Sequence, residues 1–352
     1  MNNTVLTVNH GQIPRILLMG WLSKIPICLI GSVGTGKTSS FHTFYNALAE
    51  NLPTLKKYVV FPGLIEASDI GGIPFVALDE KRKQKCIEFA MLKLLPFDTD
   101  DECLILFDEF DRADKHVQNA CMQILLNGHI HGHQLSPNSM SILTMNGSTD
   151  IYTTPLSEAV RTRVCSLFVS NVARDNLDAW DLWAEEEGIH ESVRGFAHFK
   201  PDLVEREIEY KELAIPNPRS RDDLSKIMKQ LDNVNIRTDD ILLPMFAGLI
   251  GKAGAIEFKA YLETFAKLPD IRVMLDDPSS IPPEMFTDPA SAFALASYLI
   301  KNVDTRNDAI KLIDITKKLR MEIAFWVIDS IKRKIPDVIS SAEYIAWDAQ
   351  TK

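Results

Sequence analysis

The chain has 352 residues, of which 46% are hydrophobic and 24% are charged, so it is neither collagen-like, disordered nor a small disulfide scaffold. Its length predicts about two domains. The formal net charge of −10 disfavours sequence-independent binding to duplex nucleic acid, because such binding needs many cations to displace counterions.

The five cysteines are scattered and form no CxxC pair, which predicts small buried thiols in a reducing compartment. The N-terminus carries no basic region ahead of an apolar stretch, so no secretory signal is expected. The longest apolar run, 241–251, is interrupted by Pro244 and falls short of the ~18 residues of a membrane-spanning helix. We therefore expect a cytoplasmic protein with no membrane span.

Short apolar runs bounded by glycine or charge alternate with helical stretches between residues 25 and 170. This alternation is typical of a parallel sheet with helices on both faces. The predicted strands are 25–30, 58–61, 103–107, 141–145 and 164–169.

Beyond Asn171 the strand pattern stops and helical apolar spacing takes over. The predicted helices are 177–187, 221–231, 239–250, 255–265, 290–301 and 308–334, with prolines between them. We expect an α/β domain at 1–170, an all-helical domain at 171–268 and a helical C-terminal extension at 269–352.

The first strand leads into GSVGTGKT at 31–38, which fits the phosphate-binding pattern G-x-x-x-x-G-K-[ST]. Glycines let the backbone turn so that its N–H groups face phosphate oxygens, and the following helix adds a favourable dipole. Lys37 is expected to reach the β- and γ-phosphates, and Thr38 to bind Mg²⁺ through its hydroxyl. The predicted nucleotide contacts are Gly31, Ser32, Val33, Gly34, Thr35, Gly36, Lys37, Thr38 and Ser39.

About 70 residues later, the apolar strand 103–107 ends in Asp108 and Glu109. Neighbouring side chains at a strand end point in different directions, so Asp108 can face a Mg²⁺ ion while Glu109 faces the attacking water. Glu109 would orient or deprotonate that water. Together with the phosphate cradle, this pair predicts hydrolysis of a nucleoside triphosphate and not only its binding.

The segment 108–125 (DEFDRADKHVQNACMQIL) resembles the one that follows the Walker B strand in the MoxR-like AAA+ ATPases of the dynein-related type. Asp111 stands where that family has Asn. Residues 69–74 (DIGGIP), 144–147 (TMNG), 156–163 (LSEAVRTR) and 217–221 (NPRSR) resemble further family segments. The resemblance covers about 25–230 and implies a P-loop fold followed by a helical lid.

The resemblance also implies roles for three residues. Asn146 would be the sensor 1 residue that touches the γ-phosphate and the water, although Gly147 replaces the usual proline. Arg163 would be the arginine finger that reaches a neighbouring subunit's nucleotide, with Arg161 as the alternative. Arg219 would contact the nucleotide from the lid as sensor 2, with Arg221 as the alternative.

Two inserted segments fall where the family has its own. His129, His131 and His133 alternate, which would place three imidazoles on one strand face, and we expect a short hairpin around Gly132 rather than a metal site. A basic stretch contains Lys81, Arg82, Lys83 and Lys85 and is either a solvated face or a contact with an acidic partner.

The resemblance implies an ATPase that uses ATP and Mg²⁺ in a homo-oligomeric, usually hexameric, ring and remodels a protein client as a chaperone. Relatives often work with a partner that carries a von Willebrand factor A domain, which here would be a separate chain. The alternatives are a ring motor or loader on nucleic acid and a scaffold gated by slow hydrolysis. ATP is preferred over GTP by resemblance alone.

Overall fold

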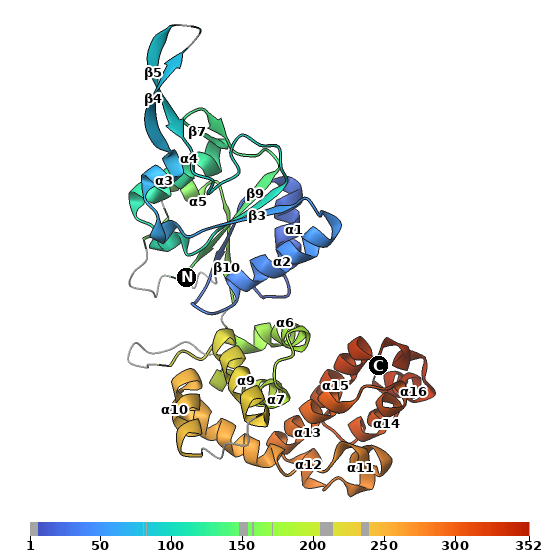
Figure 1. Ribbon diagram of the computed structural model, residues 1–352. Coiled ribbons are helices and arrows are strands. Elements are labelled where there is room, and N and C mark those ends of the chain that lie inside the picture. The colour runs from blue at the N-terminus through green and yellow to red at the C-terminus, as the bar shows by residue number, and fades with distance from the viewer. Residues whose placement is uncertain are drawn as a thin grey trace, which may run out of the picture. The chain divides into compact units, whose positions relative to one another are not determined.

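The computed structural model describes residues 6–79, 81, 83–147, 154–156, 158–170, 172–204, 214–233 and 239–351. The chain forms two compact units, Met1–Asn171 and Val172–Lys352, and each is described by itself. Figure 1 shows the α/β character of the first unit and the helical character of the second. Arg82, one of the four basic residues singled out above, lies outside the described residues.

The first unit is built on a six-stranded sheet in which every pair of neighbouring strands is parallel. This confirms the predicted parallel sheet. A short edge strand, not predicted, precedes the five strands that the apolar runs indicated. In spatial order the strands are β1 (Thr7–Val8), β10 (Cys165–Val169), β2 (Ile27–Ile30), β9 (Ser139–Met145), β6 (Cys103–Phe107) and β3 (Lys56–Val60).

Both faces of this sheet are covered, which is why its central strands are apolar without alternation. Leu104 and Leu106 of β6 belong to one buried cluster, whereas Ile105 and Phe107 belong to the other. The first cluster includes residues of α1 (Ile13–Ser23) and α2 (Lys37–Asn51). The second includes residues of α3 (Ala67–Gly71), η2 (Phe110–Arg112), α4 (Lys115–Asn127) and α5 (Glu158–Arg161). A short turn of 3-10 helix, η1 (Pro62–Leu64), follows β3.

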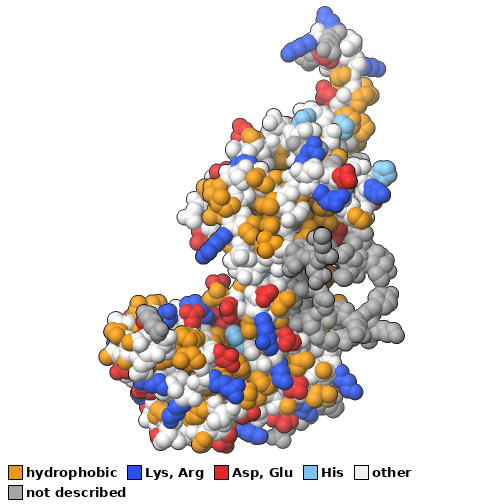
Figure 2. All heavy atoms as spheres, turned by 180° about the vertical axis from the view of Figure 1, so that it is seen from behind, with side chains coloured by type: hydrophobic (Ala, Val, Ile, Leu, Met, Phe, Trp, Pro, Cys, Tyr) orange, Lys and Arg blue, Asp and Glu red, His pale blue; other side chains and the backbone are white. Residues whose placement is uncertain are grey.

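A two-stranded ribbon projects from the first unit (Figure 1). It consists of antiparallel strands β4 (Ile73–Asp79) and β5 (Gln84–Ala90). The exposed fractions of Val76 (64%), Leu78 (63%) and Ile87 (59%) are high for apolar side chains, and Figure 2 shows hydrophobic side chains along the ribbon. Lys81, Lys83 and Lys85, at and near its tip, are exposed too. The sequence pattern did not predict these strands.

The predicted hairpin around Gly132 is present, with β7 (His129–Ile130) paired to β8 (His133–Gln134). The three histidines do not share one strand face, the arrangement that was the alternative to the hairpin. His131 lies in the turn with a positive φ of 48°, because a two-residue hairpin loop needs left-handed backbone there. His131 instead stacks on Phe89 of the ribbon, with ring centroids 4.0 Å apart.

The cysteines are only partly as expected. Cys28, Cys103 and Cys121 are buried, and burial raises the pKa of Cys28 and Cys121 to about 12. Cys165 is exposed and Cys86 is half-buried, contrary to the prediction of buried thiols. Cys165 begins β10, where the two-residue edge strand β1 pairs only with Phe168 and Val169.

The first helices of the second unit surround a core that contains Phe196, Phe258 and Tyr261. Trp180 is buried in this core and Trp183 packs against it. The helices are α6 (Ala173–Glu186), α7 (Glu191–Phe199), α8 (Pro201–Val204), α9 (Pro218–Asn233) and α10 (Asp239–Phe265).

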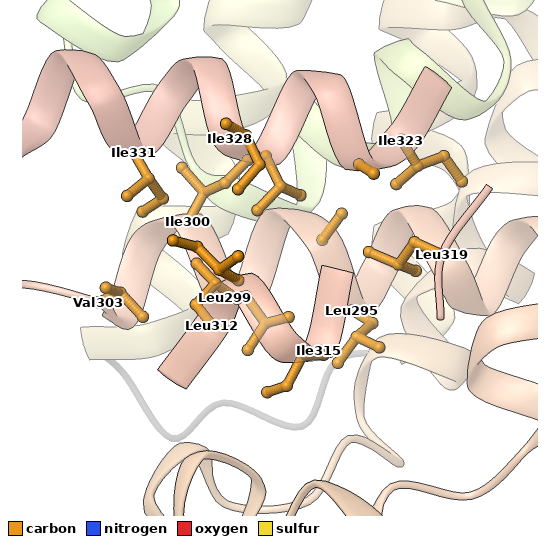
Figure 3. Close-up of a cluster of buried hydrophobic side chains, with 14 of the residues drawn as sticks. Leu295, Leu299, Ile300, Val303, Leu312, Ile315, Leu319, Ile323, Ile328 and Ile331 are labelled. Atoms are coloured by element: carbon orange, nitrogen blue, oxygen red, sulfur yellow. The ribbon is translucent and has the colours of Figure 1, made fainter. Parts of the chain in front are cut away.

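Residues 268–347 contribute a second core, part of which is drawn in Figure 3. In Figure 3, Leu295, Leu299 and Ile300 of α13 face the isoleucine and leucine side chains of the two following helices. The elements are α11 (Ile271–Asp276), η3 (Pro278–Ser280), α12 (Glu284–Thr287), α13 (Pro289–Asn302), α14 (Arg306–Thr316), α15 (Met321–Lys334), η4 (Pro336–Ser340) and α16 (Ala342–Thr351).

The single helical stretch predicted at 308–334 is therefore wrong, because α14 ends at Thr316 and α15 begins at Met321. Buried apolar residues in both helices kept the spacing continuous, while Leu319 of the connection itself enters the core. Lysines at 317 and 318 follow the end of α14, where a positive charge interacts favourably with the helix dipole.

One helix among the described residues, Ile241–Phe265, is long and apolar enough by length and composition to cross a membrane, with a mean hydropathy of 1.5. This differs from the expectation of no such run, because the helix continues past Lys252. Gly251 has non-helical backbone angles (φ 77°, ψ 164°), so α10 is kinked there, between the two helices that the spacing predicted. Its Phe246, Ile250 and Phe258 are buried in the core of the second unit.

Candidate functional site

The cradle, the carboxylate pair and Asn146 lie at one edge of the sheet. Strand β9 lies between β2 and β6, and all three run in the same direction, so their carboxyl ends meet at this edge. The cradle follows β2, Asp108 and Glu109 follow β6, and Asn146 follows β9. Ligands of open α/β sheets bind at this edge.

The cradle has the backbone that its glycines permit. Gly34 and Gly36 have φ values of 78° and 91°, in the left-handed region where a Cβ is strained. Thr35 Oγ1 donates to Ser32 O at 2.9 Å, which braces the loop from inside. Helix α2 begins at Lys37, so its unpaired first N–H groups point into the loop.

The side chain of Lys37 folds back onto the first residues of the cradle and is 7% exposed. Its Nζ donates to Gly31 O at 2.7 Å and to Ser32 O at 2.8 Å. These bonds hold the ammonium group against the loop whose N–H groups are to meet phosphate oxygens. A buried lysine in this position supplies a positive charge to an anion bound in the loop.

Thr38 and Asp108 are in contact although 70 residues separate them. Thr38 Oγ1 donates to Asp108 Oδ1 at 2.9 Å and lies 3.1 Å from Oδ2. A hydroxyl and a carboxylate are oxygen ligands of the kind that Mg²⁺ takes beside phosphates. The pairing fits their predicted use as metal ligands.

Glu109 is held through its backbone and its side chain. Its φ of 52° is left-handed, which for a non-glycine residue costs of the order of 1 kcal/mol. Its N–H donates to Thr144 Oγ1 at 2.9 Å. Its carboxylate forms an ion pair with Arg112, with Nε to Oε2 at 3.1 Å, and both side chains are nearly half exposed.

Asn146 is 7% exposed, and its Nδ2 is a buried donor for which the described residues offer no acceptor. Its backbone N–H donates to Asp111 Oδ2 at 2.9 Å. A buried amide group without a partner is unfavourable unless something else accepts from it. A phosphate oxygen or a water at this edge of the sheet would supply that acceptor.

Sequence reasoning missed three residues of this site. Thr144 contacts both Asp108 and the backbone of Glu109, Asp111 holds Asn146, and Arg112 pairs with Glu109. Their signal was present in the two motifs themselves, since Thr144 precedes Asn146 by two residues and shares its side of the strand. His10 also adjoins the cradle, with Nδ1 at 3.4 Å from Ser40 Oγ.

Both candidates for the arginine finger lie at the same place in the first unit. Arg161 ends α5, Arg163 follows two residues later, and both are exposed. The structure does not separate them, so the preference for Arg163 stays a prediction.

The two sensor 2 candidates lie in the second unit and differ in burial. Arg219 is exposed in the first turn of α9. Arg221 is fully buried, with its guanidinium 4.5 Å from the Trp180 ring centre. Arg221 therefore stabilises the core of its own unit, and Arg219 remains the candidate for nucleotide contact.

A parallel sheet that presents a glycine cradle, a lysine and a strand-end carboxylate at one edge defines a P-loop nucleoside triphosphatase domain. Within that class, residues 26–164 match the model of the AAA domain, dynein-related subfamily. The match covers about two fifths of the chain, and an AAA domain implies a P-loop ATPase.

No curated protein matches the sequence. Among solved structures, two point variants of RuvB from Thermotoga maritima are each 14% identical. One has a TM-score of 0.41 over 76% of this chain and 77% of that chain, and the other 0.43 over 84% and 85%. NtrX from Brucella abortus in complex with ADP is 13% identical, with a TM-score of 0.41 over 93% of this chain and 68% of that chain. Likenesses this remote say nothing about substrate or partner.

Proposed function

We propose that this chain binds ATP with Mg²⁺ and hydrolyses it in the cytoplasm. The observation that carries the proposal is the buried Nδ2 of Asn146, a donor without an acceptor among the described residues, at the edge where Lys37 and Asp108 also lie. A triphosphate in the cradle would supply that acceptor and would place its terminal phosphate between these groups.

Each side chain then has one task. Lys37 and the N–H groups of the cradle bind the phosphates, and Asn146 donates to the terminal phosphate or to the attacking water. Glu109 orients that water and accepts its proton. Thr38 and Asp108 would hold Mg²⁺, which neutralises phosphate charge when bound.

The test is phosphate release by the purified chain with ATP and MgCl₂, alongside binding of a fluorescent ATP analogue. Lys37→Ala should lose binding, because it removes the cation of the cradle. Glu109→Gln should keep binding and lose hydrolysis, because an amide cannot accept the proton. Binding that survives Lys37→Ala unchanged would contradict the placement of the phosphates.

We further propose a homo-oligomeric ring, hexameric by family resemblance, in which Arg163 completes the neighbour's site. A planar cation at the transition state raises rates about 10³–10⁵-fold in phosphoryl-transfer enzymes. Subunits with Arg163→Ala and subunits with Lys37→Ala should each be inactive alone. Mixed in equal amounts, they should regain activity, because some interfaces then pair an intact cradle with an intact arginine. Mixtures that stay inactive at every ratio would remove the support for action across an interface.

The proposed client is a protein, in the manner of a MoxR-like chaperone. The proposed partner is a separate chain that carries a von Willebrand factor A domain. The exposed apolar residues Val76, Leu78 and Ile87 support a protein contact at the ribbon. The exposed lysines at and near its tip would favour an acidic one. Hydrolysis that is stimulated instead by DNA or RNA, with a steep salt dependence, would favour the nucleic-acid alternative.

A further inference from the structure

Thr144 occupies a central place in the site that no motif assigned to it. It lies on β9, is 1% exposed, and follows Leu143, which pairs with Phe107 at the end of β6. Thr144 is therefore level with Asp108, the next residue after β6. Its side chain is turned toward the two carboxylate residues and has no access to solvent.

The hydroxyl of Thr144 uses its single donor and one acceptor on these neighbours. It donates to Asp108 Oδ1 in a short hydrogen bond and accepts the backbone N–H of Glu109 at 2.9 Å. A hydroxyl has only one proton to donate, so these two contacts fix its orientation.

Asp108 is consequently held from two sides. Thr38 donates to it from the first turn of α2, and Thr144 donates to it from β9. Two directional hydrogen bonds from separate elements restrict the side-chain rotamer more than one does, and preorganisation of this kind keeps a site ready for its ligand.

Glu109 is held at its backbone by the same hydroxyl. Its left-handed φ of 52° persists only where neighbouring groups stabilise it. The bond from Glu109 N–H to Thr144 is one such restraint, and the direction of the Glu109 side chain depends on that backbone conformation.

We propose that Thr144 is a positioning residue of the hydrolytic site, whose hydroxyl sets the rotamer of Asp108 and the backbone of Glu109 together. This inference rests on the proposed ATPase function. Thr144 contacts neither phosphate nor water in this proposal. It acts through the two carboxylate residues, so it couples the metal-binding side chain to the water-activating one.

The decisive comparison is between Thr144→Val, which keeps the shape and removes the hydroxyl, and Thr144→Ser, which keeps the hydroxyl. A matched control is Ile142→Val, two residues earlier on the same face of β9, which removes one methylene from the core without reaching the site. Thermal unfolding of each variant shows which losses come from reduced stability.

The readouts are kcat, the MgCl₂ concentration for half-maximal hydrolysis, and the affinity for a fluorescent ATP analogue with MgCl₂ and with EDTA. Thr144→Val should lower kcat at least tenfold and raise the MgCl₂ requirement severalfold, while affinity in EDTA stays at the wild-type level. Thr144→Ser should stay within about threefold of wild type, and Ile142→Val should match wild type.

Two results would overturn the proposal: wild-type kcat and MgCl₂ dependence in Thr144→Val, or equal damage in Thr144→Ser and Thr144→Val, which would assign the residue to packing. A wild-type chain that binds nucleotide but releases no phosphate contradicts the proposed ATPase function instead. In that case the affinity measurements still test the role of Thr144. Thr144→Val should lose the gain in affinity that MgCl₂ gives the wild type.

Discussion

Asp111 is a carboxylate in a place where the surrounding backbone needs an acceptor. It is fully buried, and its Oδ2 accepts the backbone N–H of Asn146 at 2.9 Å. Its backbone carbonyl also accepts the N–H of Thr154 at 2.7 Å. The side chain therefore ties the start of the segment after β9 to the segment after β6.

Removal of that acceptor should destabilise the chain. We expect Asp111→Ala to lower the free energy of unfolding by about 1–3 kcal/mol, because the buried N–H of Asn146 is left without a partner. Asp111→Asn retains an oxygen that can accept this bond and should lose less. Urea denaturation of the three proteins measures the difference, and an alanine variant as stable as wild type would contradict it.

At the residue scale, the motif positions were predictable and their supports were not. The roles proposed for the glycines, Lys37, Thr38 and Asp108 follow from residue type and spacing. Thr144 and Asp111 act through contacts between the β6 and β9 segments, and the sequence does not show which strand lies beside which. Arg112 pairs with Glu109 within one segment. Arg219 was the predicted sensor 2 residue and Arg221 the alternative, and the burial of Arg221 against Trp180 became visible only in the structure.

His133 of the β7–β8 hairpin connects that hairpin to the ribbon through hydrogen bonds. Nε2 of His133 lies 2.9 Å from Phe89 O at the end of the ribbon, and Nδ1 lies 2.5 Å from Asp98 Oδ2. Both partners are acceptors, so both ring nitrogens can donate only when the imidazole is protonated. The hydrogen bond to Asp98 is the main cause that raises the pKa of His133, and the same bond lowers the pKa of Asp98.

The connection that His133 makes between the hairpin and the ribbon should therefore weaken as pH rises. A raised histidine pKa contributes stability that is fully present below the ordinary value near 6.5 and is lost as pH rises through the raised value. The ionised carboxylate of Asp98 contributes stability with the opposite pH dependence. That stability is lost only as pH falls through the lowered pKa of Asp98, below about 4. We expect amide exchange in β4 and β5, corrected for intrinsic pH effects, to be faster at pH 8.5 than at pH 6.

The control is His133→Gln, which cannot become charged and should remove the pH dependence. NMR titration of His133 gives the pKa directly. A pKa below the ordinary histidine range, or amide exchange that does not change with pH in the wild type, would contradict the role of protonated His133 in this connection.

At the element scale, the strands that could be predicted from the sequence belong to the central sheet. The three central strands β2, β9 and β6 are buried almost throughout, and burial leaves a pattern of apolar residues. The ribbon is exposed on both faces, so Phe75, Val76 and Leu78 gave no alternation to read. The break between α14 and α15 carries neither proline nor glycine, and the apolar spacing runs on across it.

At the scale of the whole molecule, the second unit is joined by a buried ionic network. Asp181 of α6 is 2% exposed and accepts from Arg194 Nε and Nη2 at 2.9 and 3.0 Å. Trp326 of α15 donates to the same carboxylate at 2.8 Å. Burial alone would raise the pKa of Asp181, but His198 and Arg194 lower it overall. Residues after 268 are thus bonded to the helices before them.

Loss of this carboxylate should affect the second unit as a whole. We expect Asp181→Ala to destabilise it by about 3–5 kcal/mol, because Arg194 keeps a buried charge without its main partner. Trp326→Phe, which removes one donor and keeps the ring, should cost about 1 kcal/mol. Calorimetry of the isolated unit 172–352 measures both, and equal losses in the two variants would contradict the central place of Asp181.

The proposed function requires hydrolysis of ATP at the carboxyl ends of β2, β9 and β6. The most direct measurement is single-turnover hydrolysis of radiolabelled ATP by wild type and Glu109→Gln at equal nucleotide occupancy. We predict phosphate release by the wild type and a rate about 10²–10⁴-fold lower in Glu109→Gln, with ATP still bound. Release at the wild-type rate by Glu109→Gln would contradict the assignment of the site.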